Sequence, residues 1–375
     1  MKSHAQFWGP GLSHDNRERK AVGWHSPRHR AGRPFRPAVL ASTVVLMLVA
    51  VLAEVLARPA SAATRRTQVL ALQPGWNSVF LEVQPTADLP EEVFRGRPVT
   101  VVACPLPGSQ AEEFLRTPGD ASWRSEHWAV WHAPGRPEAF LSNLHRIQAR
   151  RAYLVHATEA FTWHVEGEGR AAEIEWQPNS CTLTGLPVAP EGSLTFAEFF
   201  QGSAAHQPLR VLRLESGEWR TLIDPGAQRV RAGEAYWIET QGASSHQGPI
   251  RLRLPARGEL DFDLRGTTAE LDLKNVSAVP VRVRMETVGG EDALLIRRVF
   301  RRERSLEPVR ETVTGVVELP ELPPGASRAL RLEPDRNAMR TVTAETLLRI
   351  SDGRGWERWI PVRARREAVG AAPLP

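Results

Sequence analysis

The chain has 375 residues, of which 42% are hydrophobic and 24% charged, a composition typical of a globular protein with two or three domains. Its net charge is +5, but residues 1–37 hold eight basic and two acidic side chains, so residues 63–375 sum to −1. This near-neutral body argues against nucleic-acid binding, which requires a concentrated basic face on the folded domain.

The first 62 residues are predicted to direct export. A basic segment precedes Ala38–Ala53, an uncharged run of 16 residues, and Ala60-Ser61-Ala62 then forms a small-x-small cleavage pattern. We expect cleavage after Ala62, because a membrane span needs about 20 apolar residues. The alternative is an uncleaved N-terminal membrane anchor, favoured by the long Arg-rich segment in front. In both cases the body is periplasmic, on the cell surface or secreted, and it touches a membrane only through an uncleaved leader.

The body opens with a unit that occurs twice. The paired positions Leu81/Leu186, Leu89/Leu194 and Phe94/Phe199 share an offset of 105 residues, whereas Tyr153/Tyr236 share an offset of 83. The first copy therefore carries a longer middle insert. We call residues 67–168 module 1 and residues 171–254 module 2, and we predict that they have one fold.

Each module is predicted to contain short strands and one short helix. The helices are expected at Pro90–Phe94 and Phe196–Phe200, with Pro90 and its following acids suited to a helix N-terminus. The β-rich runs are Ser78–Val83, Val99–Ala103, Trp128–His132, Ala152–His156 and Phe161–Val165 in module 1, and Leu209–Leu214, Glu218–Ile223, Ala235–Glu239 and Ile250–Leu254 in module 2. Residues 105–125 are predicted to be loop.

Residues 257–366 are predicted to form an antiparallel, immunoglobulin-like β-sandwich, followed by a tail at 367–375. Polar and apolar residues alternate in Glu259–Leu264, Ala269–Leu273, Val281–Met285 and Arg328–Leu332, which is the period of half-buried strands. Asp352-Gly353 is a favoured hairpin turn. The Arg-rich segment 289–311 looks the least structured. The predicted fold class is therefore mainly β: two small repeated β-rich modules and a sandwich.

Short motifs carry a family resemblance. Gly75-Trp76-Asn77, followed by Val83-Gln84-Pro85, resembles the Gly-Trp-Asn β-modules of large bacterial secreted and surface proteins. Leu271–Ser277 and Leu322–Gly325 are similar to bacterial immunoglobulin-like domains. The two resemblances cover residues 67–254 and 257–366. Module 2 departs from the pattern, with Ser180-Cys181-Thr182 in place of Gly-Trp-Asn. The resemblance implies no catalytic chemistry.

The tryptophans of module 1 are the candidate ligand residues. Exposed flat rings can bind the apolar faces of sugars, and such a platform would use Trp123, Trp128, Trp131 and Trp163. The competing interpretation is that tryptophans in β-rich runs form the core. We favour the core, and we predict buried positions for Trp131 and Tyr153 with Leu214 and Tyr236 as their counterparts in module 2.

No catalytic residue, metal site or cofactor site is predicted. Five histidines crowd module 1, but only His127 and His132 approach the spacing of zinc ligands, so surface and loop positions are favoured: His127, His132, His145, His156 and His164. The sequence contains no nucleophile elbow, no metalloprotease helix motif, no phosphate loop and no C-x-x-C. The sequence does not decide whether Cys104 and Cys181 form a disulfide.

The predicted function is that of a non-catalytic, exported surface or envelope protein that acts in interaction or scaffolding with an unknown protein or glycan partner. One alternative is a carbohydrate-binding module, which exposed coplanar tryptophans would favour. The other is a secreted hydrolase without a local motif, which two convergent acids in a cleft, one with a raised pKa, would favour.

Overall fold

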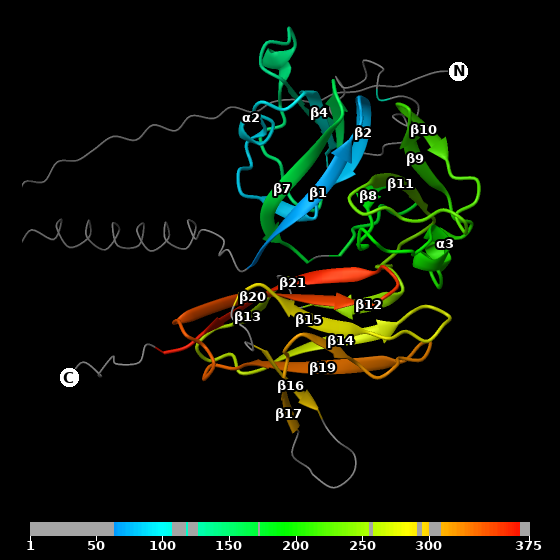
Figure 1. The fold of residues 1–375 in the computed structure, drawn as a ribbon. Coiled ribbons are helices and arrows are strands. Elements are labelled where there is room, and N and C mark those ends of the chain that lie inside the picture. The colour runs from blue at the N-terminus through cyan, green and yellow to red at the C-terminus, as the bar shows by residue number, and fades with distance from the viewer. Residues whose placement is uncertain are drawn as a thin grey trace, which may run out of the picture. The chain divides into compact units, whose positions relative to one another are not determined.

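The computed structural model describes residues 64–106, 118, 127–171, 173–254, 258–290, 295–299 and 309–367 (Figure 1). The export segment, the candidate Trp123 and nearly all of the C-terminal tail lie outside these residues. The part of the chain that is described contains no helix that is long and apolar enough to cross a membrane.

Module 1 consists of two antiparallel sheets. The smaller has the order β1-β7-β3, with β1 Arg65–Leu72, β7 Phe161–Gly169 and β3 Val83–Pro85. The larger has the order β2-β6-β4-β5, with β2 Gly75–Phe80, β6 Ala152–Ala157, β4 Val99–Pro105 and β5 Trp128–His132. Helix α2 (Pro90–Val93) and a short 3-10 turn at Ala139–Leu141 complete the module.

Module 2 has one sheet in the order β10-β9-β11-β8, with β8 Ser180–Gly185, β9 Val211–Glu215, β10 Glu218–Thr221 and β11 Ala235–Thr240. Reversed, this order is β8-β11-β9-β10, which matches β2-β6-β4-β5 strand for strand in chain order. Helix α3 (Phe196–Phe199) begins at a capping box between Thr195 and Glu198. The two modules thus share the topology of their four-stranded sheets, as the sequence predicts.

The registers of the two sheets also agree. Val79 lies opposite Tyr153 in module 1, and Thr184 lies opposite Tyr236 in module 2, so both sequence offsets hold in one ladder. Each tyrosine hydroxyl accepts a hydrogen bond from the backbone amide five residues earlier. The distances are 2.7 Å from Gln148 N to Tyr153 Oη and 3.0 Å from Arg231 N to Tyr236 Oη.

Three predicted equivalences need correction. The helix N-caps pair Leu89 with Thr195 and the C-caps pair Phe94 with Phe200, an offset of 106 residues. The predicted matches of Leu89 to Leu194 and of Phe94 to Phe199 are therefore each displaced by one residue. The match of Trp131 to Leu214 is also wrong. Leu214 lies opposite Trp219 as Pro105 lies opposite Trp128, which makes Trp219 the counterpart of Trp128.

The C-terminal unit is a sandwich of two five-stranded sheets. One has the order β12-β14-β19-β16-β17, with β12 Ile250–Arg253, β14 Ala269–Asn275, β19 Ser327–Pro334, β16 Leu295–Val299 and β17 Val309–Thr312. The other has the order β13-β21-β20-β15-β18, with β13 Leu260–Phe262, β21 Glu357–Arg365, β20 Thr343–Ser351, β15 Arg284–Val288 and β18 Val316–Glu318. Buried residues of both sheets belong to one core, which includes Leu273, Leu332, Met285 and Ile360.

Three features of the sandwich differ from the sequence predictions. Strand β12, assigned to module 2, pairs with β14 and so belongs to the sandwich. The segment 289–311, taken as the least structured, contains β16 and part of β17. Finally, β13 pairs with β21 in parallel. The Arg-rich segment hid its strands because charged residues interrupt the apolar signal, with Arg297 and Arg298 adjacent in β16.

The four-stranded sheets of the two modules bury residues on both of their faces, except that β10 buries only Trp219. One face of β5 places Trp128 and Val130 in an apolar cluster with Leu183 and Trp237 of module 2. The other face places Trp131 in the inner core of module 1. Strands buried on both faces are expected to be continuous apolar runs, which explains why these runs lack the alternation seen in the sandwich.

Module 2 and the sandwich are joined by backbone hydrogen bonds and a shared core. Ala189 N donates to Gly355 O at 2.7 Å, and Val188 bridges Trp356. The indole of Trp356 is fully buried and donates to Gln247 O at 3.0 Å. Residues 59–375 accordingly form one compact unit.

Candidate functional site

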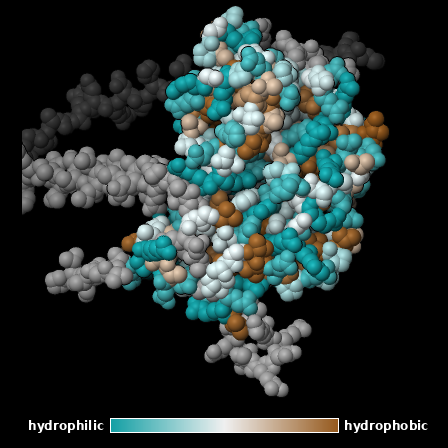
Figure 2. Space-filling view, viewed as in Figure 1, coloured by the Kyte–Doolittle hydropathy of each residue, from teal (hydrophilic) through white to brown (hydrophobic). Residues whose placement is uncertain are grey.

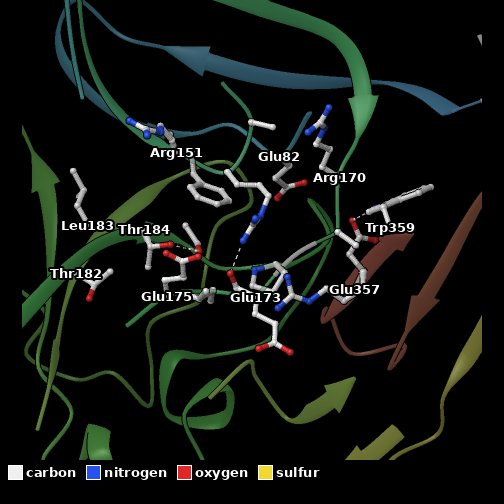
Figure 3. A pocket seen from close by; sticks show the side chains of 18 of the residues that line it. Glu82, Arg151, Arg170, Glu173, Glu175, Thr182, Leu183, Thr184, Glu357 and Trp359 are labelled. Atoms are coloured by element: carbon white, nitrogen blue, oxygen red, sulfur yellow. Dashed lines mark hydrogen bonds between the residues drawn. The ribbon is translucent and has the colours of Figure 1, made fainter. Parts of the chain in front are cut away.

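A polar pocket of about 370 Å³ lies where segments of module 1, module 2 and the sandwich meet (Figure 3). Its charged lining consists of five arginines and four glutamates: Arg66, Arg150, Arg151, Arg170, Arg358, Glu82, Glu173, Glu175 and Glu357. Strand β8 contributes Thr182–Gly185, and the ring of Phe80 also lines the pocket. A volume of this size is at the lower end of the range for small-ligand sites, about 300–1,000 Å³.

Glu82 is a largely buried acid of this pocket. Its carboxylate forms an ion pair with Arg66, and its Oε1 is buried with no hydrogen-bond partner among the described residues. Burial raises the pKa of Glu82, although the neighbouring Arg66 guanidinium opposes the rise. Glu82 therefore keeps one buried carboxylate oxygen without a partner.

Glu357 is held by its neighbours. Its Oε2 accepts from Arg349 Nε at 2.9 Å, and its Oε1 accepts from the Trp359 indole at 2.9 Å, the bond drawn in Figure 3. The guanidiniums of Arg66 and Arg349 lie 5.0 Å and 5.4 Å from the centre of the Trp359 ring, within the range of cation–π contacts. This network fixes one wall of the pocket.

Arg150 has an unusual backbone conformation. Its φ of +63° lies in the left-handed region, which disfavours side chains with a Cβ. The counterpart of Arg150 at offset 83 is Gly233, with a φ of +73°, so module 2 uses glycine where module 1 keeps an arginine. The Arg150 guanidinium donates to Glu173 O.

A second arginine of the pocket, Arg358, is also partly desolvated. Burial lowers the pKa of Arg358 to about 10, and the positive charge of Arg150 contributes to this shift while Glu82 opposes it. Arg358 Nη2 donates to Gln247 Oε1 at 2.9 Å. Arg150 and Arg358 are therefore two partly desolvated cations of one pocket, and Glu173 offsets part of the charge of each.

The residues predicted as a sugar platform do not line this pocket. Trp128, Trp131 and Trp163 are only 2%, 3% and 2% exposed, so no open ring face remains for a sugar. The same burial confirms the predicted core positions of Trp131 and Tyr153. The indole of Trp131 donates to Glu91 at 3.2 Å, and its ring packs 5.5 Å from Phe94.

The described histidines and cysteines of the modules do not gather into a metal site or a disulfide. Among the described residues, no group of three or more His, Cys, Asp or Glu could hold a metal ion. His156 Nδ1 lies 2.7 Å from Thr100 Oγ1. Cys104 and Cys181 are free thiols, and burial raises the pKa of Cys104 to about 11, which makes this thiol unreactive at neutral pH.

Sequence reasoning missed the pocket because its residues come from six separate segments. One signal was available: aligning Tyr153 with Tyr236 places Arg150 on Gly233, and an arginine that replaces a glycine in a repeated turn marks an unusual position.

Comparisons with known proteins add only distant likenesses. No protein-family model and no curated protein matches the chain. Among solved structures, 33% of the chain is similar to 60% of a chain in the CsuC–CsuE chaperone–tip adhesion subunit complex of Acinetobacter baumannii, at 10% identity and a TM-score of 0.19. A second similarity covers 32% of the chain and 98% of a FixG-related protein of Vibrio parahaemolyticus, at 12% identity and a TM-score of 0.19. The periplasmic chaperone SfaE matches over 33% of the chain and 60% of its own, at 8% identity. Scores this low carry no functional argument, so the fold assignment depends on the sheets described above.

Proposed function

We propose that the chain is an exported, non-catalytic protein that acts in interaction or scaffolding at the cell surface or in the envelope. The observation that carries this proposal is an exposed strand edge in the sandwich. Strands β17 and β18 are the outer strands of the two sheets, and Val309 and Val316 on them are 37% and 57% exposed. Figure 2 shows a largely hydrophilic face with scattered hydrophobic residues.

An edge strand presents unpaired backbone donors and acceptors, to which an extended segment of a partner can add as a further strand. Apolar side chains on that edge give the added strand something to pack against. We call the outer sides of β17 and β18 the sandwich edge. Joining the two modules rigidly to the sandwich would hold this edge at a fixed distance from the N-terminal side of the chain.

A photo-crosslinking amino acid at Val316 tests the interaction role in cells that produce the protein. We expect a discrete crosslinked product from Val316, and none from the control position Ile223, which is 99% exposed but lies in a loop after β10. Equal, diffuse crosslinking from both positions would contradict a specific edge interaction.

Hydrolysis is a second candidate, favoured by Glu82 and Glu357 in one pocket and the raised pKa of Glu82. Against it, both oxygens of Glu357 hold structural donors, and Glu82 pairs with Arg66. The carbohydrate-binding alternative loses three of its four residues to the core. Turnover of a glycoside or ester by the purified chain, lost in Glu82→Gln with an unchanged unfolding midpoint, would favour the hydrolase instead.

A further inference from the structure

The pocket lies beside a point where the pairing of the two modules is not symmetric. At the edge of β2, Phe80 N donates to Gly233 O at 2.8 Å, and Val79 bridges Glu234. The counterparts of Phe80 and Gly233 are Gly185 and Arg150. Among the described residues, no backbone bond joins these two, and both line the pocket instead.

The edge of β8 therefore faces the pocket with backbone groups that the ladder does not use. Glu239 N donates to Arg210 O, so the backbone N–H and C=O groups of residue 239 point from β11 toward β9. By alternation along the strand, the backbone groups of residues 237 and 235 point the same way. The backbone groups of Thr184 and Thr182 therefore form the hydrogen bonds to β11. Leu183 and Gly185 point their amide groups away from β11, although Gly185 O already accepts from the Thr184 hydroxyl at 3.1 Å.

The side chains around this edge favour an anion. Five arginines line the pocket against four glutamates, and Arg150 and Arg358 are partly desolvated. Glu357 is held by Arg349 and the Trp359 indole, and Glu82 pairs with Arg66, while Glu173 offsets part of the charge of Arg150 and Arg358. Guanidinium groups recognise carboxylates through paired, charge-assisted hydrogen bonds. Arg150 has a strained backbone conformation at a position where module 2 has a glycine. The arginine at this position places a guanidinium group at the pocket. Residues held in disfavoured backbone regions cluster at ligand sites.

We propose that the pocket binds the carboxyl-terminal end of an extended peptide, which adds to the free edge of β8 while Arg150 and Arg358 hold its terminal carboxylate. The four lining residues of β8 offer about 13 Å of strand, enough for a few peptide residues. This inference rests on the proposed interaction role and names a class of partner for it.

The probe is an equimolar mixture of random hexapeptides with free carboxyl termini. The mixture is dialysed against the purified body of the protein, and the retained peptides are quantified by mass spectrometry. The matched probe is the same mixture with amidated termini. We expect the free-carboxylate peptides to be retained at least about tenfold better, because a charge-assisted contact is lost on amidation. Hydrogen exchange should show new protection at the amides of Leu183 and Gly185.

Arg150→Gly separates binding from folding. Glycine suits a positive φ, so the variant should keep or raise the thermal midpoint and yet lose at least about tenfold in retention. Ser216→Gly is the control, because Ser216 also has a positive φ of 52° but lies in the β9–β10 turn and does not line the pocket. It should bind like the parent chain.

Three outcomes would overturn the inference: equal retention of amidated peptides, undiminished binding by Arg150→Gly, or displacement by acetate without protection of β8, which would mark a small-carboxylate site. If these occur while the Val316 crosslink persists, only this inference fails and the interaction role stands.

Discussion

At the scale of single residues, the two tyrosines and Trp131 show how far a repeated sequence predicts burial. Tyr153 and Tyr236 recur because each must fill the core and also hold the turn five residues earlier through its hydroxyl. Both features follow from one aligned pair. The positive φ of Arg150 is not visible in its own residue type, and only its alignment with Gly233 of module 2 points to it.

Replacing Trp131 with alanine should lower the free energy of unfolding by about 3–5 kcal/mol, as for other large buried aromatic side chains. Trp131 is 3% exposed and its indole also satisfies Glu91. Phe140→Ala is the control, because Phe140 is 83% exposed and its loss should change stability by less than about 0.5 kcal/mol. Chemical denaturation measures both, and an unchanged midpoint in Trp131→Ala would show that the ring is not part of the core.

At the scale of elements, strands with one buried face could be predicted better than their pairing. The alternating segments became β14, β15 and β19, and the hairpin at Asp352-Gly353 joins β20 to β21. Partners were less predictable. Strand β12 follows module 2 in the chain but pairs with β14, because its buried Ile250 and Leu252 complete the sandwich core. Sequence proximity does not decide which sheet a strand joins.

A buried histidine pair beside helix α3 gives this region a pH-dependent stability. His206 lies against Trp176 and Phe200, with His246 5.9 Å away, and its Nδ1 lies 2.7 Å from Ser203 Oγ. Burial, followed by the charge of His246, lowers the pKa of His206 to about 4. Burial also lowers the pKa of His246, whose Nε2 donates to Phe199 O at 2.7 Å while Arg251 adds an unfavourable positive charge.

The unfolded chain binds a proton at His206 near pH 6.5, whereas the folded chain does so only near pH 4, so stability is complete above about pH 6.5 and falls as the pH drops. Between about pH 7 and about pH 5, His206 should account for a loss of about 2 kcal/mol. Urea unfolding of His206→Gln should show a shallower pH dependence than the parent, while His164→Gln, on an exposed position of β7, should not. Parallel curves for His206→Gln and the parent would rule out this role.

At the scale of the whole molecule, the mature chain is predicted to begin after Ala62. The pattern Ala60-Ser61-Ala62 follows an uncharged run that is short for a membrane span. Intact-mass analysis of the envelope or secreted fraction should find a chain starting at Ala63. A chain that retains Val39–Leu56 would show that the segment is an anchor.

The division into two modules and a sandwich stays a prediction from the sequence, and the contacts that join these parts could not be predicted from it. The apolar runs Ala152–Val155 and Ala235–Ile238 suit a core, yet nothing in them reveals that one face of each packs against the other module. The pocket arises from the same contacts, so its residues became recognisable only when the segments were brought together.

The claim on which the rest depends is that the modules and the sandwich form one rigid body, because a scaffold presents its edge and pocket only while their spacing is fixed. Differential scanning calorimetry of residues 64–367 tests this claim. One cooperative transition is expected, with calorimetric and van't Hoff enthalpies equal, and Trp128→Ala should lower its single midpoint because Trp128 lies in the cluster shared by the modules. Separate transitions, with only one of them moved by Trp128→Ala, would contradict the shared core.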